Sequence, residues 1–596
     1  MPNTPLNVLN EVFGYAEFRG QQQAIIDSAI QGQDALVLMP TGGGKSLCYQ
    51  IPAMLRDGTG LVVSPLIALM QDQVAALHEL GINAGFLNSS QSPEARRTVL
   101  AALRSGALQL LYIAPERLAT DHTRALLQDI PLSLIAIDEA HCVSQWGHDF
   151  RQDYLSLGEL GALFPGVPRM AVTATATEKT RQEIVERLEL RQPKTFVESF
   201  DRPNIGYAVQ AKTDPKRQLL NFLQGHRDEA GIVYCLSRKK TESTAAWLCQ
   251  NGFDALPYHA GLAPEIRSEN QRRFLADDAV IVVATVAFGM GIDKPDVRFV
   301  AHLDLPKSME SYYQETGRAG RDGGASEAWM VFGMQDVVRL GQMLDESDAG
   351  QAYKRFERYK LDALLGWCEG TGCRRRPLLE YFGDALTEDC GNCDGCLVPA
   401  KTWDGTQAAR KLLSAVYRTG QRFGAGHVVD VLLGRVTDKV RQHQHDSLSV
   451  FGVGSDLAAN RWRSVVRQLI VAGHLRSDAE RYGALVLTES SRAVLRNEVA
   501  LQFREDPKGP VKASRRSASN HVVADDDREL WEALRACRQQ HANEHDVPAY
   551  VIFHDKTLHE MLQIRPTTNA QLLAISGVGQ TKLDRYGDSF LALFRD

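Results

Sequence analysis

The chain has 596 residues, enough for about four domains of average size, so a single small module is excluded. Hydrophobic residues make up 44% and charged residues 23%, ordinary globular values that exclude a mostly disordered, collagen-like or coiled-coil chain. Lys and Arg (67) are outnumbered by Asp and Glu (73), so the net charge of −6 indicates no polyanion partner, and any nucleic-acid site must be local. Without an apolar run of membrane-span length or a signal-peptide pattern at residues 1–11, we expect a soluble cytoplasmic protein that does not contact membranes.

Short β-branched and apolar runs alternate with helical stretches between residues 36 and 331. This alternation predicts parallel sheets with crossover helices, and the length suits two α/β domains. The polar turn Phe200-Asp-Arg-Pro-Asn204 separates two series of strands, so we place the first domain at 1–200 and the second at 201–338. The expected strands include 35–39, 61–64, 110–113, 134–137, 232–234 and 281–283.

The C-terminal part of the chain is predicted to be mostly helical. A charged helical pattern from Val338 leads into a cysteine cluster, and a further helical region ends in the apolar strand Ala484-Leu-Val-Leu487. A stretch rich in Pro, Gly, Ser, Lys and Arg then predicts a flexible linker. The assigned bounds are 339–403 for the cysteine-containing subdomain, 404–503 for the next domain, 504–524 for the linker and 525–596 for a small helical domain.

A glycine-rich segment, Pro40-Thr-Gly-Gly-Gly-Lys-Ser46, follows an apolar strand and opens a helix. The backbone N–H groups of such a loop can cradle phosphates, and the helix N-terminus adds its positive dipole. Met39 stands where the strict phosphate-loop pattern has Gly, so a glycine-rich turn without a ligand is the alternative. The predicted phosphate-binding residues are Thr41, Gly42, Gly43, Gly44, Lys45 for the β and γ phosphates, and Ser46 for Mg²⁺.

Two carboxylates and two arginines complete the expected catalytic set. Asp138 and Glu139 follow the apolar run 134–137, where Asp138 can hold Mg²⁺ and Glu139 can orient and polarise the attacking water. Arg318 and Arg321 lie among glycines in the second α/β series, and their guanidinium forks match phosphate oxygens. An arginine finger supplies roughly 10³ to 10⁵ in rate, so we expect that neither domain hydrolyses ATP alone.

Four of the ten cysteines share one short stretch. Their spacing offers four soft ligands and predicts a closed, tetrahedral Zn²⁺ site. An iron–sulfur cluster is the competing chemistry, and Cys368 is an alternative to the first ligand. The predicted ligands are Cys373, Cys390, Cys393 and Cys396.

The accessory regions contain two segments with basic residues. Residues 457–470 predict a helix with Arg463 and Arg467 one turn apart on its polar side, with a solvated basic face as the alternative. The turn Ser576-Gly-Val-Gly579 precedes Lys582 and can approach phosphate. Residues 525–596 hold eight Lys and Arg against twelve Asp and Glu, a net charge of −4, so we expect a weak, structure-selective or protein-binding role for this domain.

With these motifs in this order, the chain resembles the two-lobed RecA-like helicases of superfamily two and, more closely, the bacterial RecQ DNA helicases. The resemblance covers essentially the whole chain and implies an α/β fold of two RecA-like parallel-sheet lobes, then a zinc-binding subdomain, a winged-helix (RQC) domain and an HRDC domain. It favours Cys373 as the first ligand, because in the family this ligand precedes a basic pair, here extended as Arg374-Arg-Arg376. The motifs that carry the resemblance are Phe13-Gly-Tyr15, Phe18-Arg19, Gln22, Met39 to Gln50, Ser64-Pro-Leu66, Asp138 to His141, Ser144 to Arg151, Thr173 to Ala176, Thr285 to Gly291 and Gln314 to Gly323.

The resemblance also implies roles for single residues. Tyr15 and Arg19 should sandwich the adenine and Gln22 should bind its edge, although Tyr15 in a core is the alternative. His141 should couple the ATP site to the rest of the protein, with Thr173 and Thr175 in the same network, unless it is a satisfied core histidine. The aromatic loop after Glu139 should sense single-stranded DNA by base stacking, with a buried aromatic cluster as the alternative. The DNA contacts predicted in this loop are Trp146, His148, Phe150 and Arg151, and the resemblance to a winged helix implies duplex-DNA contacts for Arg463 and Arg467.

The function implied by the resemblance is an ATP-dependent DNA helicase that moves 3′ to 5′ on single-stranded DNA and unwinds duplexes in recombination, repair and the SOS response. The expected cofactors are ATP, Mg²⁺ and Zn²⁺, and the expected partners are single-stranded and duplex DNA, single-stranded-DNA-binding protein and other repair proteins. We expect a monomer. An RNA helicase or a translocase that does not unwind is one alternative, and an inactive DNA-binding scaffold is another, against which the intact catalytic set argues.

Overall fold

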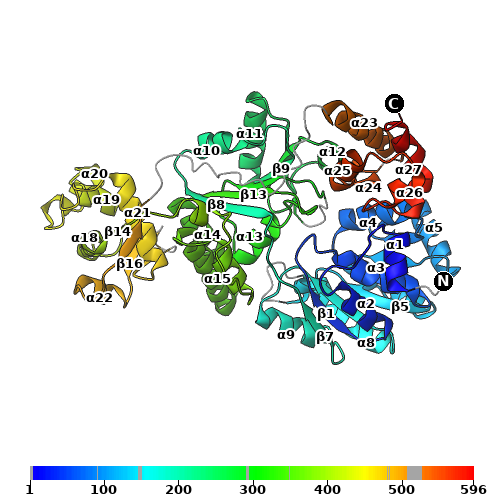
Figure 1. The fold of residues 1–596 in the computed structure, drawn as a ribbon. Coiled ribbons are helices and arrows are strands. Elements are labelled where there is room, and N and C mark those ends of the chain that lie inside the picture. Colours follow the sequence, from blue (N-terminus) through cyan, green and yellow to red (C-terminus); the bar gives the residue numbers. More distant parts are fainter. Residues whose placement is uncertain are drawn as a thin grey trace.

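The computed structural model describes residues 4–89, 91–144, 151–289, 294–347, 350–478, 481, 484–505, 527–545 and 547–595. It contains two parallel sheets in succession, a helical subdomain, a winged-helix domain and a C-terminal helical domain (Figure 1). Within these ranges, no helix has both the length and the apolar character needed to span a membrane.

The first lobe is built on a seven-stranded parallel sheet in the order β3-β4-β2-β5-β6-β1-β7. Its central strands are buried along their whole length, as expected for a parallel sheet with helices on both faces. Its strands are β1 (Ala35–Leu38), β2 (Thr59–Val63), β3 (Ala84–Leu87), β4 (Leu110–Ile113), β5 (Leu132–Ile137), β6 (Arg169–Thr173) and β7 (Lys194–Val197). Its helices are α1 (Pro5–Glu11), α2 (Gln22–Ile30), α3 (Lys45–Leu55), α4 (Ile67–Glu79), α5 (Pro93–Arg104), α6 (Pro115–Leu118), α7 (Asp121–Gln128), α8 (Leu160–Leu163) and α9 (Glu178–Arg187), with 3-10 turns at Ala140–Val143 and Gln152–Glu159.

The second lobe repeats this design with a six-stranded parallel sheet in the order β10-β11-β9-β12-β13-β8. Helices join β8 to β9, β9 to β10, β10 to β11 and β12 to β13, and such crossover connections suit parallel strands. Its strands are β8 (Ile205–Ala211), β9 (Gly231–Tyr234), β10 (Ala255–Tyr258), β11 (Ile281–Ala284), β12 (Phe299–His302) and β13 (Ser326–Phe332). Its helices are α10 (Pro215–Leu223), α11 (Arg238–Gln250), α12 (Pro264–Ala276) and α13 (Met309–Thr316).

A helical subdomain follows the second sheet and packs on it. It contains the hairpin of α14 (Met334–Asp345) and α15 (Gln351–Glu369), then α16 (Arg375–Tyr381) and the short α17 (Asp394–Leu397). Asp394 accepts a hydrogen bond of 3.0 Å from the backbone of Val209 in β8, and Arg375 donates one of 2.7 Å to the carbonyl of Ile205. The subdomain therefore covers the free edge of the second sheet.

The winged-helix domain has its own core around Trp462, which is fully buried and donates a 2.7 Å hydrogen bond to the carbonyl of Gly454. Figure 1 shows this domain and the C-terminal domain at opposite ends of the molecule. Its elements are β14 (Thr402–Asp404), α18 (Thr406–Arg418), α19 (Ala425–Leu432), α20 (Asp438–Gln442), a 3-10 turn at His445–Ser447, α21 (Ala459–Val471), β15 (Leu475–Asp478), β16 (Ala484–Leu487), α22 (Ser491–Leu495) and β17 (Gln502–Arg504).

The C-terminal domain docks on the first lobe, beside α1 and α4 (Figure 1). It is a bundle around buried residues such as Phe590. Its helices are α23 (Arg528–His545), α24 (Ala549–Ile552), α25 (Asp555–Ile564), α26 (Asn569–Leu573) and α27 (Gln580–Ala592).

The predicted fold class is confirmed, because both α/β series form parallel sheets with crossover helices. The apolar runs at 35–39 and 134–137 are β1 and β5, and the strand at 484–487 is β16. In the two lobes, strands β3, β6, β7, β8, β10, β12 and β13 lie outside the runs named above. Several of them include a charged residue, such as Arg169 in β6, Lys194 in β7 and Glu327 in β13.

Candidate functional site

The glycine-rich loop connects β1 to α3. It lies at the edge of the first sheet that faces the second lobe. Gly42 and Gly44 have φ of +83° and +80°, left-handed backbone that glycine adopts without strain. Lys45 begins α3, and its Nζ donates hydrogen bonds of 3.1 and 3.3 Å to the carbonyls of Met39 and Pro40. The backbone turn and the helix start predicted for phosphate binding are thus both present.

A cavity of about 410 Å³ lies beside this loop, and we call it the interlobe cavity because both lobes line it. Its volume is within the range that holds a small ligand. From the first lobe it is lined by residues that include Tyr15, Arg19, Gln22, Thr41, Gly42, Gly44, Lys45, Ser46, Asp138 and Glu139. The second lobe contributes residues that include Gln314, Arg318, Arg321 and Asp322.

The two carboxylates follow β5 directly. Asp138 is 8% exposed, and its backbone N–H donates 2.9 Å to the carbonyl of Val63 in the neighbouring strand. Glu139 has φ of +49°, a strained conformation for a residue with a side chain and one found mostly at functional sites. Among the described residues, buried Oε2 of Glu139 has no hydrogen-bond partner, although Nδ1 of His141 lies 3.4 Å away. A buried carboxylate oxygen without a donor is available to water or substrate.

His141 connects the carboxylates to the next strand. It is fully buried, and its Nδ1 lies 2.9 Å from Oγ1 of Thr173, at the end of β6. The same hydroxyl lies 3.4 Å from the backbone nitrogen of Thr175. The structure therefore brings the predicted histidine and threonines into one network, in which hydrogen bonds polarise one another.

The two arginines enter the cavity from the second lobe, on the segment after α13. Arg318 is 4% exposed, and within the described chain its Nε has no hydrogen-bond partner. A Cβ at Gly42 would lie 3.3 Å from Cα of Arg321, so the two loops are in direct contact. Neither lobe alone forms this site.

The predicted adenine-binding residues lie at one end of the same cavity. The guanidinium of Arg19 is 5.9 Å from the centroid of the Tyr15 ring, a spacing at which the two planes can interact. Gln22 is 2% exposed, accepts a 2.9 Å hydrogen bond from the backbone of Arg19 and donates 3.1 Å to the carbonyl of Gly43. Gln22 thus links the adenine segment to the phosphate loop.

Sequence reasoning missed Arg202, which lies in the turn predicted only as a domain boundary. Its guanidinium donates to the carbonyls of Thr41 in the phosphate loop and of residues 317, 319 and 320 beside the two arginines. Carbonyl acceptors leave no side-chain signature, so no pairing motif could have revealed these contacts.

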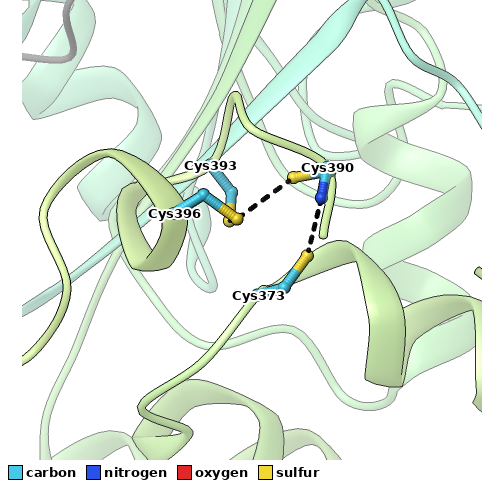
Figure 2. Close-up of side chains that lie close together, drawn as sticks. All are labelled: Cys373, Cys390, Cys393 and Cys396. Atoms are coloured by element: carbon cyan, nitrogen blue, oxygen red, sulfur yellow. Dashed lines mark hydrogen bonds between the residues drawn. The ribbon is translucent and has the colours of Figure 1, made fainter. Parts of the chain in front are cut away.

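The four cysteines predicted as zinc ligands come together in the segment that follows α15 and ends with α17, which contains Cys396. Figure 2 shows their side chains converging on one point. Their sulfur atoms all lie within 4.8 Å of one another. The backbone N–H of Arg374 donates 3.2 Å to Sγ of Cys393, and that of Cys390 donates 3.4 Å to Sγ of Cys373. Such donors stabilise thiolates, so the donor set fits Zn²⁺.

Cys368 is not part of this cluster. It is fully buried in α15, where burial raises the pKa of its thiol; its side chain packs in the hydrophobic core and its carbonyl accepts a hydrogen bond from Arg374. The choice of Cys373 as the first ligand therefore agrees with the structure.

The predicted DNA contacts divide into three groups. Trp146, His148 and Phe150 lie outside the described residues. Arg151 is half-buried, and its Nη1 donates 3.3 Å to the carbonyl of Pro65. Arg463 is exposed on α21.

The prediction that Arg467 lies on the polar side of its helix, facing DNA, is wrong. Arg467 is 8% exposed and donates a 2.7 Å hydrogen bond to Glu369 at the end of α15. Arg504 also pairs with Glu369, at 3.4 Å. The helical spacing correctly placed Arg463 and Arg467 on the same face of α21. The neighbouring helical subdomain covers the end of that face that bears Arg467.

The C-terminal domain closes part of the interlobe cavity. Tyr550, Val551, His554, Lys556, Thr557 and Lys582 are among its lining residues. The turn at 576–579, predicted to approach phosphate, lies against the first lobe, where the N–H of Gly577 donates 2.9 Å to the carbonyl of Gly14, and its residues Ser576 and Gly577 also line the cavity. Lys582 donates to the carbonyls of Val551 and Ile552, and burial lowers its pKa to about 8.

Comparison with known proteins matches every part of this architecture. Five domain families match, in chain order: DEAD/DEAH box helicase (19–184), helicase conserved C-terminal domain (214–323), RecQ zinc-binding (334–397), RQC domain (399–512) and HRDC domain (527–594). Together they cover both lobes, the cysteine cluster and the two accessory domains.

Whole-length relatives are also similar. The ATP-dependent DNA helicase RecQ of Pasteurella multocida is 46% identical over 100% of this chain and 94% of its own length. The protein of the same name from Haemophilus influenzae is 46% identical over 100% of this chain and 96% of its own, and that from Bacillus subtilis is 39% identical over 98% and 97%. Among solved structures, the DUF1998 helicase MrfA bound to DNA is 20% identical, with a TM-score of 0.47 over 65% of this chain and 59% of that one.

Proposed function

Because this chain belongs to the RecQ family of ATP-dependent DNA helicases, we propose that ATP hydrolysis in the interlobe cavity drives it 3′ to 5′ along single-stranded DNA. It is an ATP-dependent DNA helicase of repair and recombination, with ATP, Mg²⁺ and Zn²⁺ as cofactors. The observation that carries the proposal is the shared cavity: Lys45 and Glu139 enter from one lobe, and Arg318 and Arg321 from the other.

The residues of the cavity divide the work of hydrolysis. Lys45 and the loop amides hold the phosphates. Ser46 and Asp138 hold Mg²⁺, which supplies neutralising charge at the phosphate oxygens. Glu139, whose buried Oε2 has no hydrogen-bond partner in the described chain, orients the attacking water and accepts its proton.

The second lobe supplies the remaining charge. Arg318 and Arg321 stabilise the negative charge that develops on the γ-phosphoryl oxygens as the bond breaks. Because they lie on the other lobe, hydrolysis requires the lobes to be closed, and release of the products lets them separate. DNA held across both lobes advances with each such cycle.

Coupling to DNA runs through His141. Its hydrogen bond with Thr173 joins the segment that bears Glu139 to the end of β6, and this segment leads in sequence to residues 144–151. We assign single-stranded DNA contacts to Trp146, His148, Phe150 and Arg151 in that stretch. Arg463, exposed on α21, is assigned to duplex DNA. A monomeric state and binding to single-stranded-DNA-binding protein belong to the same proposal.

Strand displacement tests the proposal. Duplexes with either a 3′ or a 5′ single-stranded tail, in DNA and in RNA, are incubated with ATP and with the protein or its Lys45→Ala variant. We expect displacement only from 3′-tailed DNA, with none by the variant. DNA-stimulated ATP turnover without displacement would leave a translocase, and unwinding of the RNA duplex would contradict the assignment to DNA.

A further inference from the structure

One arginine in the connection between the lobes touches both catalytic loops. Nη1 of Arg202 donates a 2.6 Å hydrogen bond to the carbonyl of Thr41 and one of 3.1 Å to that of Gly317. Nη2 donates 2.9 Å hydrogen bonds to the carbonyls of Ala319 and Gly320. A single guanidinium therefore serves four backbone acceptors, one in the phosphate loop of the first lobe and three in the loop that holds Arg318.

The division of these contacts is unequal. Three of the four hydrogen bonds are made to the second lobe, so Arg202 is attached mainly to the loop that holds Arg318 and Arg321. A single hydrogen bond connects it to the phosphate loop of the first lobe. Asn204, two residues on, donates to the carbonyls of Gly320 and Gly324 at 2.9 and 2.8 Å and so holds the same loop, with no hydrogen bond to the phosphate loop among the described residues. The chain thus contains one residue that bridges the lobes and a close neighbour that does not.

The chemistry requires arginine at this position. A guanidinium has five N–H donors in a rigid plane and keeps its charge, whereas the lysine ammonium is a point charge on a flexible stem. Within the described chain, the guanidinium of Arg202 donates its hydrogen bonds to four neutral carbonyls. Its position beside Gly42, which contacts Arg321, places it where the two loops meet.

We propose that Arg202 is a positioning residue that sets the Arg318–Arg321 loop against the phosphate loop when the lobes close. Its bond to Thr41 forms on closing and breaks on opening, while its three bonds within the second lobe persist. Arg202 does not line the cavity, so it acts through Arg318 and Arg321 and not on the phosphates. This inference rests on the proposed hydrolysis of ATP in the interlobe cavity.

Steady-state kinetics on the full chain with its zinc test the inference, using Arg202→Gln, Arg202→Lys and, as matched control, Asn204→Ala. We expect Arg202→Gln to lower the DNA-stimulated kcat for ATP by about 10- to 100-fold, since an error of about 1 Å in a catalytic group costs on the order of 100-fold. The KM for ATP and the binding of a fluorescent ATP analogue should change by less than about threefold, because the phosphate loop keeps its own contacts. Arg202→Lys should recover part of kcat, and Asn204→Ala should lower it by less than about threefold.

Small-angle scattering supplies a readout that a purely local structural role would not change. A non-hydrolysable ATP analogue should reduce the radius of gyration of the wild-type protein and of Asn204→Ala. The reduction should be smaller for Arg202→Gln. An unchanged kcat in Arg202→Gln, or equal losses in Arg202→Gln and Asn204→Ala, would overturn the inference. If Arg202→Gln does not fold, as judged by its thermal transition, Arg202→Lys decides by the same criteria. A wild-type protein without DNA-stimulated ATP turnover would instead refute the proposed function.

Discussion

The guanidinium of Arg585, in the last helix of the chain, donates a 2.7 Å hydrogen bond to the carboxylate of Glu79 in the first lobe, 506 residues away. Glu79 is 8% exposed and accepts a second hydrogen bond, from the hydroxyl of Tyr586. The C-terminal domain also reaches the second lobe, where Arg535 pairs with Asp278. Docking of this domain therefore combines charged contacts, two of them to Glu79, with the backbone hydrogen bond from Gly577 to Gly14.

Replacing Glu79 with Ala should release the C-terminal domain from the first lobe. The substitution leaves Arg585 and Tyr586 without their acceptor, at a cost of about 1 to 3 kcal/mol to docking. We expect a larger radius of gyration by small-angle scattering, while Asp57→Ala, which removes an exposed carboxylate of the same lobe, should leave it unchanged. Equal radii for Glu79→Ala and the wild type would show that other contacts hold the domain.

Glu139→Gln should bind ATP but hydrolyse it slowly. The amide keeps the size of the side chain but cannot accept the proton of the attacking water, and loss of a general base typically costs about 10²- to 10⁴-fold. We expect this fall in DNA-stimulated kcat with nearly unchanged binding of a fluorescent ATP analogue. Lys45→Ala is the contrasting control, since it should weaken binding itself. If Glu139→Gln hydrolysed ATP at a rate within tenfold of the wild type, another residue would have to be the general base.

Arg463 and Arg467 lie one helical turn apart, but their replacement by alanine should affect different properties, namely duplex-DNA binding for Arg463 and stability for Arg467. Arg467→Ala leaves Glu369 buried with only its longer contact to Arg504, and breaking a buried ion pair costs about 3 to 5 kcal/mol. We expect a lower thermal transition temperature for Arg467→Ala. Arg463→Ala should keep the wild-type transition and bind duplex DNA more weakly, with a shallower dependence on salt. A stable Arg467→Ala, or unaltered duplex binding by Arg463→Ala, would contradict this division.

Cys393→Ser should lose the bound zinc and destabilise the helical subdomain. Four thiolates complete a structural site, and metal binding to such a site contributes directly to folding. Metal analysis should give one zinc ion per wild-type chain and much less for Cys393→Ser. Cys368→Ala is the matched control, because Cys368 lies outside the cluster, and full zinc content is expected. If Cys368→Ala lost zinc and Cys393→Ser kept it, the assignment of the ligands would be wrong. Visible absorption from bound iron would favour an iron–sulfur cluster over zinc.

Much of this site could be predicted from local sequence. The glycine-rich loop, the carboxylates after β5 and the four cysteines are each held by short-range geometry, in which strand, turn and helix follow in order. The strand, turn and helix of such a motif are adjacent in sequence. The place of its residues in the site can therefore be predicted from the local sequence.

Contacts between domains could not be predicted in this way. Arg467 has the helical spacing of a solvent-facing residue, but its partner Glu369 comes from another domain 98 residues earlier. Arg202 binds carbonyls, which every residue possesses, and the partner of Glu79 lies at the far end of the chain. Periodicity describes one element at a time, so it cannot show which face a distant domain will cover.

The position of the zinc-binding subdomain affects the behaviour of the chain in concentrated solution. Strand β8 is at the edge of the second sheet, and edge strands present unpaired peptide groups that can recruit another strand. Here Asp394 accepts from the N–H of Val209 and Arg375 donates to the carbonyl of Ile205, so both kinds of peptide group are occupied. Both residues lie close in sequence to zinc-binding cysteines. Zinc bound by these cysteines would hold this cover in place, and would thereby oppose the edge-to-edge joining of sheets from neighbouring molecules.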